Sequence, residues 1–337
     1  MKLLYLVSST DHPHDYGCDF LLDGFRELLG PHNVFDWPEK PCLHLAPGEP
    51  RDLCNIDSDA WWPSKGRIDP SDLARYCQLA LVACQPDDLE GIARIRLFCH
   101  TLWPADKPLA VVDMTDHVRN LRPFYEEVTG RSLVGWYFKR ELPLGKATEW
   151  GAHPCPLTYP AHRAPNPLPP KMPRLFYYAT HHGGGKAGVP RLQILRDLRA
   201  LLPATRLDVA LFPSQNGRPS PEDYHARMSR ALVGIHWNGA ANWDANRWSE
   251  SLAFGLCVVA ETPRICYPYP FEHLRHCVFV KRSEEVASAV RMLLQQPTWA
   301  LNMAAAAHEH FLTHHCARAR AAYVLRMIQG ERRWALT

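Results

Sequence analysis

Short apolar runs alternate with segments of helical periodicity along most of the chain. In the first half, the runs with strand character are residues 2–8, 33–37, 79–83, 108–114 and 133–139. The segments with apolar residues at helical spacing in the same half are 19–29, 69–78 and 87–102. Strands that alternate with helices predict parallel βαβ units with right-handed crossovers.

A proline-rich stretch interrupts this alternation and separates two halves. Residues 150–173 contain prolines at 154, 156, 160, 165, 167, 169, 170 and 173, and a segment so poor in helix and strand formers predicts an interdomain linker. The second half then repeats the pattern, with strands expected at 174–179, 206–212, 233–237, 257–260 and 277–281. Its expected helices are 189–202, 221–231, 247–254, 283–296, 298–315 and 317–329.

The predicted fold class is α/β, with two Rossmann-like domains that face a central cleft. A chain of 337 residues is too long for one ordinary core, since domains usually contain about 100–200 residues. The predicted boundaries are an N-terminal domain at 1–150, a linker at 151–172, a second domain at 173–316 and a C-terminal helix at 317–337 that can cross back to the first domain. In open α/β sheets, ligands bind at the carboxyl ends of the strands, so the loops that follow strands are the candidate sites.

The balance of charges indicates which kind of ligand the protein can bind. The net charge is +3, and 35 acidic residues are mixed among 38 basic ones. Binding to a nucleic-acid backbone needs a concentrated basic face, which this distribution does not offer. We therefore expect no nucleic-acid partner, and instead a small anionic ligand that a few local cations hold.

The cysteines and the N-terminus bear on the compartment. The chain has 11 cysteines, and none of them forms a CxxC pair, which is typical of buried free thiols in a reducing compartment. The apolar N-terminal run is short and ends in polar residues, as a first strand does and a signal peptide does not. No stretch approaches the ~20 apolar residues that span a bilayer. We expect a cytoplasmic protein without a transmembrane segment, for which peripheral membrane contact stays open.

The most informative segment is residues 224–261. A strand leads into the small polar loop 238–242, and the helix that follows carries Arg247 and Glu250. Free N–H groups at a helix N-terminus favour an anion, and Arg247 in the first turn adds a planar fork suited to a phosphate. Glu250 shares a face with Arg247 and can accept two hydrogen bonds from a ribose diol. The alternative is an Arg–Glu pair on the surface of an ordinary amphipathic helix.

A family resemblance favours the first alternative. The run from Arg247 to Glu261, RWSESLAFGLCVVAE, resembles the signature of the group 1 and the spore-maturation-type glycosyltransferases. These families carry an Arg or an aromatic residue, then Glu-Ala-hydrophobic-Ala-x-Gly, and then a hydrophobic strand. Their ribose-binding Glu matches Glu250, and the small residues at their helix end match Ala253 and Gly255.

The resemblance covers residues 174–325 and implies the GT-B architecture, with a nucleotide-sugar site in the second domain and acceptor-side residues in the first. Where the group 1 motif has its first Glu, this chain has Asn242, and Asp244 lies close by. The donor-binding candidates in this segment are Asn238, Gly239, Asp244, Arg247 and Glu250. Arg247 is also a catalytic candidate, because its charge can stabilise the departing diphosphate.

A second donor-side candidate is the loop at residues 180–186, after the first strand of the second domain. Gly183, Gly184 and Gly185 let the backbone approach a ligand, and Lys186 can bring a charge to a diphosphate. The corresponding loop of the group 1 enzymes is similar in carrying Gly and basic residues. The spacing is not that of a Walker loop, and a plain surface turn is the alternative. The neighbouring residues His181 and His182 point to opposite faces of an extended chain, so no metal site is expected there.

Acceptor-side candidates come from the first domain. The loop after its first strand contains Asp11, His12, His14 and Asp15, which are suited to general-base work on a hydroxyl group. The choice between His12 and His14 stays open, and a purely structural polar loop is the alternative.

A competing acceptor-side cluster, Asp113, Asp116 and His117, ends a later strand. The run WYFKRE resembles a stretch near the domain junction of the spore-maturation-type relatives. Its Lys139 and Arg140 either reach a phosphate across the cleft or are simply solvated.

These segments together predict an enzyme that transfers a sugar from a nucleotide diphosphate sugar to a hydroxyl acceptor, which is a glycan, a lipid-linked molecule or a small molecule. No cofactor and no metal are expected, because cationic side chains and helix dipoles can neutralise the diphosphate. A nucleotide-sugar epimerase of the same fold and a non-catalytic nucleotide-sugar-binding scaffold are the alternatives. A dinucleotide dehydrogenase is disfavoured, since no GxGxxG follows either opening strand.

Overall fold

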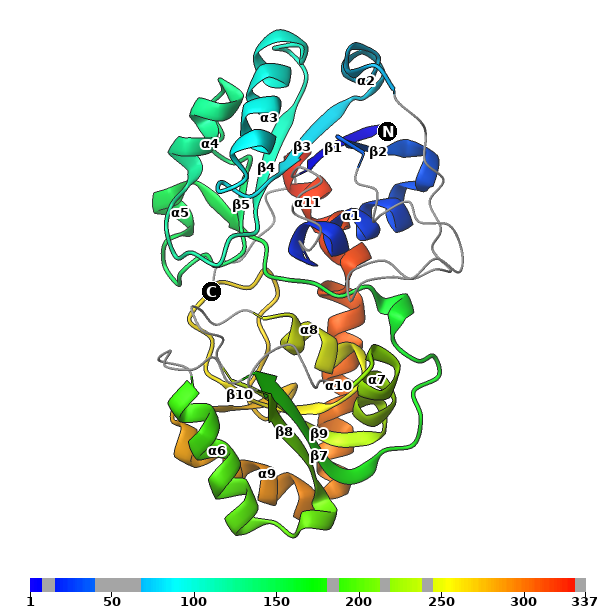
Figure 1. Cartoon of the computed structure of the whole chain (residues 1–337), viewed down its shortest axis with the longest axis vertical. Coiled ribbons are helices and arrows are strands. Elements are labelled where there is room, and N and C mark those ends of the chain that lie inside the picture. The colour runs from blue at the N-terminus through cyan, green and yellow to red at the C-terminus, as the bar shows by residue number, and fades with distance from the viewer. Residues whose placement is uncertain (8–15, 40–67, 181–187, 213–218, 238–244, 331–337) are drawn as a thin grey trace. The chain divides into compact units, whose positions relative to one another are not determined.

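The structure is a computed structural model (Figure 1), and it describes residues 1–7, 16–39, 68–180, 188–212, 219–237 and 245–330. The chain divides into two compact units. Unit 1 comprises Met1–Pro160, Ile265–Pro268 and Ala317–Thr337, and unit 2 comprises Ala161–Arg264 and Tyr269–Cys316. Each unit has its own parallel sheet.

Unit 1 contains a six-stranded parallel sheet in the order β2-β1-β3-β4-β5-β6. Its strands are β1 (Leu3–Val7), β2 (Val34–Trp37), β3 (Leu79–Ala83), β4 (Leu109–Asp113), β5 (Tyr137–Lys139) and β6 (Ala152–Pro154). Its helices are α1 (Tyr16–Leu29), α2 (Pro70–Tyr76), α3 (Leu89–Thr101), α4 (Arg122–Thr129), α5 (Ala147–Trp150) and α11 (Ala317–Ile328).

Strand β1 illustrates why this sheet is buried on both faces. Leu3, Tyr5 and Val7 pack with α1 and α11 on one face, whereas Leu4 and Leu6 pack with α2 and α3 on the other. Helices cover both faces of a parallel sheet, so its strands consist almost entirely of apolar residues and lack the alternation of a half-exposed strand.

Helices α1 and α11 lie against each other at Gly24. A Cβ atom at this position would lie 2.1 Å from the carbonyl oxygen of Ala317, so only glycine allows the approach. The Ala317 N–H also donates a hydrogen bond to the carbonyl oxygen of Tyr159, at 3.1 Å. The C-terminal helix is therefore part of the core of unit 1 (Figure 1).

The linker that follows the first sheet begins later than the sequence pattern predicted. Residues 152–154 form β6, which pairs with β5, although the predicted linker starts at residue 151. A proline is tolerated at the end of an edge strand, where no neighbouring strand needs its N–H. Three residues are too few to show an alternating pattern, which is why the sequence did not reveal this strand.

Unit 2 contains a five-stranded parallel sheet in the order β11-β10-β9-β7-β8. Its strands are β7 (Met172–Thr180), β8 (Leu207–Phe212), β9 (Ala231–His236), β10 (Cys257–Glu261) and β11 (Cys277–Val280). Its helices are α6 (Gly188–Leu201), α7 (Pro221–Arg230), α8 (Asn246–Ala253), α9 (Val286–Gln295) and α10 (Pro297–His314).

The strand order of unit 2 reverses at β7. This strand lies between β8 and β9. In open α/β sheets, ligands bind where the strand order reverses, which here is at the carboxyl ends of β7 and β9. Successive side chains of β7 point to opposite faces: Tyr177 packs with Ile194 of α6, whereas the Tyr178 ring meets the Tyr224 ring of α7 with centroids 6.1 Å apart. Helices α6 and α7 therefore cover opposite faces of the sheet.

The predicted fold class is confirmed in that both units are α/β and both sheets are parallel. The predicted helix start at Asp69 is also confirmed, since its carboxylate accepts a hydrogen bond from the Ser71 N–H. Among the helices that the structure describes, none combines the length and the apolar character needed to cross a membrane.

Candidate functional site

Helix α8 begins at the carboxyl edge of the unit 2 sheet. Its N-cap residue, Ala245, provides no side-chain hydrogen bond, and its first turn holds no acidic residue. Trp248 is 1% exposed and packs against His236 of β9 and against Phe271, with ring centroids 5.5 and 4.9 Å apart. This packing fixes the first turn of α8, where N–H groups without intrahelical partners favour an anion.

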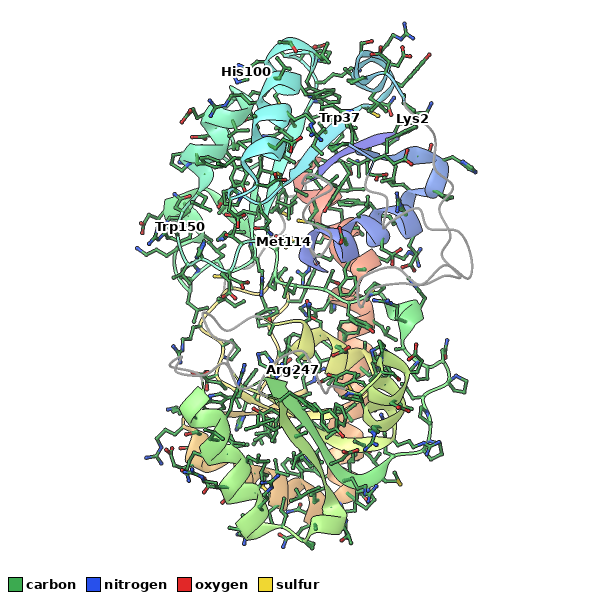
Figure 2. The ribbon with its side chains drawn as sticks, viewed as in Figure 1. Lys2, Trp37, His100, Met114, Trp150 and Arg247 are labelled. Carbon is green, nitrogen blue, oxygen red and sulfur yellow. The ribbon has the colours of Figure 1, made fainter. Side chains whose placement is uncertain are left out.

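Two arginines of unit 2 act on each other electrostatically. Arg247 is in the first turn of α8, and Arg191 lies near the start of α6. Arg191 is only 4% exposed; its burial lowers the pKa of its guanidinium, and the positive charge of Arg247 lowers this pKa further. Burial raises the pKa of Tyr177 on β7, and both arginines oppose that shift, so Tyr177 lies within electrostatic reach of the pair. Figure 2 shows Arg247 at the end of the sheet to which the arrowheads point.

This arrangement is suited to a phosphate group. The planar guanidinium fork of an arginine matches the oxygens of a phosphate, and an anion reduces the repulsion between two nearby arginines. Arg191 lies near the start of the helix that follows β7 and Arg247 near the start of the helix that follows β9, and β7 and β9 are neighbours in the sheet. A ligand at the carboxyl ends of these strands would face the first turns of both helices.

The sequence pattern missed Arg191. Its burial could not be read from the sequence, because an arginine near a helix start is usually solvated. The signal that was present is its position, just after the Gly-rich loop that follows the first strand of the unit, in the first turn of the next helix.

Glu250 is held by two side chains of α7. Its carboxylate oxygen Oε2 accepts a hydrogen bond from the Tyr224 hydroxyl at 3.1 Å, and Oε1 lies 3.1 Å from Nε2 of His225. The side chain is 15% exposed, so it is accessible to a small ligand. Within the described part of the chain Arg247 forms no ion pair, and the alternative of an Arg247–Glu250 surface pair is therefore wrong.

Asp113 and Lys139 form a buried network in unit 1. Both side chains are 0% exposed, and Nζ of Lys139 lies 3.1 Å from Oδ2 of Asp113. The Thr115 hydroxyl donates to Oδ1 of Asp113 at 2.6 Å, and the Tyr137 hydroxyl donates to Oδ2. This network holds the ends of β4 and β5 together, and the expectation that Lys139 is solvated or reaches a phosphate is wrong. An acceptor hydroxyl has no access to the Asp113 carboxylate in this arrangement.

The other members of that acceptor-side cluster are at the surface. Asp116 has a side chain 60% exposed and pairs with Arg140, and His117 is exposed. Both follow the carboxyl end of β4, as the sequence predicted. Their acceptor-side role stays a prediction.

Several predicted site residues lie outside the described residues. In the first domain these are the acceptor-side and catalytic candidates Asp11, His12, His14 and Asp15. On the donor side they are Gly183, Gly184, Gly185, Lys186, Asn238, Gly239 and Asp244. Their roles stay predictions.

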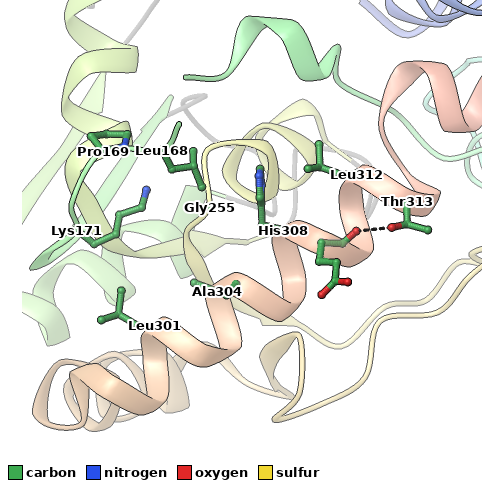
Figure 3. A pocket seen from close by; sticks show the side chains of 11 residues that line it. Leu168, Pro169, Lys171, Gly255, Leu301, Ala304, His308, Leu312 and Thr313 are labelled. Carbon is green, nitrogen blue, oxygen red and sulfur yellow. Dashed lines mark hydrogen bonds between the residues drawn. The ribbon is translucent and has the colours of Figure 1, made fainter. Parts of the chain in front are cut away.

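An apolar recess lies elsewhere in unit 2, between the segment at 168–171 and helix α10 (Figure 3). Its volume is about 450 Å³, and leucines, alanines and a proline dominate its lining. Lys171 lines it too, but its ammonium donates to the carbonyl oxygens of Ser229 and Phe254, at 2.7 and 2.5 Å. The recess lacks the cationic groups of the arginine pair, and Lys171 serves there to join the ends of α7 and α8.

A metal site is not evident in the part of the chain that the structure describes. There, no three His, Cys, Asp or Glu side chains come together as ligands. Two carboxylates in an Asp-x-Asp motif can also bind a metal. The one such triplet in the sequence, at residues 57–59, lies outside the described residues. Metal independence therefore stays a prediction.

The second half of the chain matches a known protein family. Residues 191–326 match the family model described as glycosyl transferase-like, and this span contains Arg191, Arg247 and Glu250. No curated protein matches the chain.

Similar solved structures cover nearly the whole chain. An alpha-glucosyltransferase in complex with UDP and a 13-mer DNA containing a central A:G mismatch has a TM-score of 0.62 at 11% identity, over 98% of this chain and 100% of that one. An alpha-glucosyltransferase in complex with UDP-glucose and DNA containing an abasic site has a TM-score of 0.60 at 10% identity, over 97% and 98%. A glycosyltransferase from Rickettsia africae has a TM-score of 0.55 at 8% identity, over 97% of both chains.

These similarities confirm the predicted resemblance to glycosyltransferases of the GT-B architecture. The family match confirms the predicted enzyme class.

Proposed function

We propose that this protein transfers a sugar from a nucleoside diphosphate sugar to a hydroxyl acceptor, and that the donor binds at the carboxyl edge of the unit 2 sheet. The observation that supports the proposal is that helix α8 carries both Arg247, whose charge acts on the buried Arg191, and Glu250, whose carboxylate is held by α7. The first two are suited to a diphosphate and the third to a ribose. The UDP and UDP-glucose in the complexes of similar structures make a uridine nucleotide the first donor to test.

The chemistry requires a stabilised leaving group. The bond between the sugar anomeric carbon and the diphosphate oxygen breaks, and the acceptor oxygen forms a new bond to the same carbon. Negative charge grows on the departing diphosphate, where Arg247 and Arg191 stabilise it in a partly buried site. The acceptor proton passes to a base, for which Asp11, His12, His14 and Asp15 are candidates.

The net charge bears on the class of acceptor, and the cysteines bear on the compartment. Two similar structures contain DNA, whereas this chain has a net charge of only +3, so we favour a glycan, a lipid-linked molecule or a small molecule. The nine cysteines among the described residues are free and buried, which supports a reducing compartment such as the cytoplasm. The arginine pair can neutralise the diphosphate without a metal, so activity should persist in a chelator.

Calorimetric titration of the purified protein with UDP, GDP, ADP and their glucose conjugates tests the donor site. We expect one nucleotide series to bind. Glu250→Ala should weaken its binding about 10- to 100-fold, since hydrogen bonds to a charged group are lost. Arg247→Ala should slow turnover on the order of 100-fold with little effect on folding.

Glu309→Ala is the matched control, because Glu309 is an exposed carboxylate that lines the apolar recess. Its affinity for the nucleotide should equal that of the wild type. If Glu250→Ala retains wild-type affinity, or Glu309→Ala loses it, the donor site is not at the edge of the sheet. Interconversion of the donor sugar without an acceptor would indicate an epimerase, and binding without any release of nucleoside diphosphate would indicate a scaffold.

A further inference from the structure

The carboxylate of Glu250 is fixed in orientation by a neighbouring helix. Tyr224 contacts one of its oxygens and His225 the other, and both residues belong to α7. The terminal torsion of a glutamate is broad when nothing restrains it. With one protein partner on each oxygen, the plane of the Glu250 carboxylate is set before any ligand arrives.

Ring packing and the hydrogen bonds of the Lys171 side chain hold α7 against α8. The His225 ring stacks on the Phe254 ring at the end of α8, with centroids 4.9 Å apart and planes at 25°. Lys171 bridges the two helices, since its ammonium donates to the carbonyl oxygens of Ser229 in the last turn of α7 and of Phe254 directly after α8. The Tyr224 ring is wedged against Phe176 of β7 in an edge-on contact, at 5.1 Å.

The remaining capacity of Glu250 matches a vicinal diol. An ionised carboxylate has about four acceptor positions, two on each oxygen. Among the described residues, Tyr224 and His225 occupy one position on each oxygen, which leaves on each a position for one further donor. Two hydroxyl groups on adjacent carbons, as in the 2′,3′-diol of a ribose, present two donors at the spacing of the two oxygens.

We infer that Tyr224 and His225 are positioning residues that orient Glu250 toward a ribose diol, and that they thereby make the site selective for ribonucleotides over 2′-deoxyribonucleotides. The inference rests on the proposed function, because it concerns the donor site. Tyr224 and His225 act through Glu250 and need not touch the ligand.

The test is the ratio of dissociation constants for a 2′-deoxynucleoside diphosphate and its ribose form, measured with the pairs of UDP, ADP and GDP. Tyr224→Phe and His225→Phe remove the donors and retain a ring for the contacts with Phe176 and Phe254. The wild type should favour the ribose form by about tenfold, as expected for one hydrogen bond to a charged group. In the double variant Tyr224→Phe/His225→Phe this ratio should fall toward one.

Two further measurements separate positioning from general damage. Affinity for inorganic pyrophosphate should stay unchanged in the double variant, since Arg191 and Arg247 are intact. His225→Gln, which retains a side-chain N–H donor, should keep more of the discrimination than His225→Phe.

A double variant whose ratio of dissociation constants stays at the wild-type value, whether or not both nucleotides bind more weakly, would overturn the inference. A wild type that binds nucleoside diphosphates without preferring ribose would overturn the inference and leave the proposed function standing. A wild type that binds none of the six nucleotides would overturn both.

Discussion

Arg247 of α8 lies close enough to Arg191 of α6 for its charge to add to the effect of burial in lowering the pKa of the Arg191 guanidinium. The two residues are on helices that cover opposite faces of one sheet. Side chains of like charge repel each other, and an anion bound near both would reduce that repulsion. A diphosphate that binds only the folded protein therefore stabilises the folded state.

Arg191→Gln should weaken binding of a nucleoside diphosphate or of pyrophosphate about 10- to 100-fold, because charge-assisted hydrogen bonds to the anion are lost. Thermal unfolding measured with and without pyrophosphate checks this, since the ligand should raise the melting temperature of the wild type and raise that of the variant less. Arg196→Gln is the control on the same helix, at an exposed position. An equal stabilisation of Arg191→Gln and the wild type would show that the anion binds elsewhere.

Lys139→Met should destabilise unit 1 by about 3–5 kcal/mol, because it leaves the buried carboxylate of Asp113 without its cation. The double variant Asp113→Asn/Lys139→Met removes both charges and should recover part of that loss. Chemical denaturation of the three proteins provides the comparison. If Lys139→Met unfolds at the wild-type denaturant concentration, while its activity falls, the residue has a catalytic role and the structural assignment is wrong.

The sequence pattern predicted most of the fold but missed one of its shortest strands. The alternation of strands and helices predicted the two parallel sheets, since both faces of a parallel strand are buried and its apolar run is unmistakable. The three-residue strand β6 escaped, because a pattern of period two needs more residues to show itself.

For the site, local spacing found Arg247 and Glu250 but could not find their partners. Arg191 lies 56 positions from Arg247 in the chain, and only the reversal of strand order at β7 brings the two together. The partners of Glu250, on α7, depend equally on how two helices pack. Asp113 was assigned to the acceptor side because it ends a strand, and its burial by Lys139 and Tyr137 could not be read from that position.

Gly24→Ala should destabilise unit 1 by about 1–3 kcal/mol, as overpacking does, despite the better helix propensity of alanine. The added methyl group would lie 2.1 Å from the Ala317 carbonyl oxygen, a backbone atom that cannot move without moving α11. Glu27→Ala, at an exposed position of the same helix, should leave the unfolding midpoint within about 0.5 kcal/mol of the wild type. Equal stability of the two variants would mean that α11 does not pack on α1 as described.

A pair of stacked histidines predicts an acid-sensitive unit 2. The rings of His276 and His310 are 4.3 Å apart at an angle of 14°, and the Glu272 N–H donates to Nδ1 of His276 at 3.0 Å. Burial lowers the pKa of both rings, and the proximity of His276 lowers the pKa of His310 further. Arg275 and His314 act in the same direction on His276, whereas the carboxylate of Glu272 opposes them.

The sign of the effect follows from linkage. The folded state resists protonation of these rings, whereas the unfolded chain takes up protons near the ordinary histidine pKa of about 6.5. Stability is therefore complete above that pH and is lost as the pH falls toward the lowered folded-state pKa. In His310→Gln one titrating ring is gone, so the drop in melting temperature between pH 7.5 and pH 5.5 should be smaller than in the wild type. His32→Gln, at an exposed position in unit 1, should show the full wild-type drop, and a His310→Gln variant with that same drop would contradict the assignment.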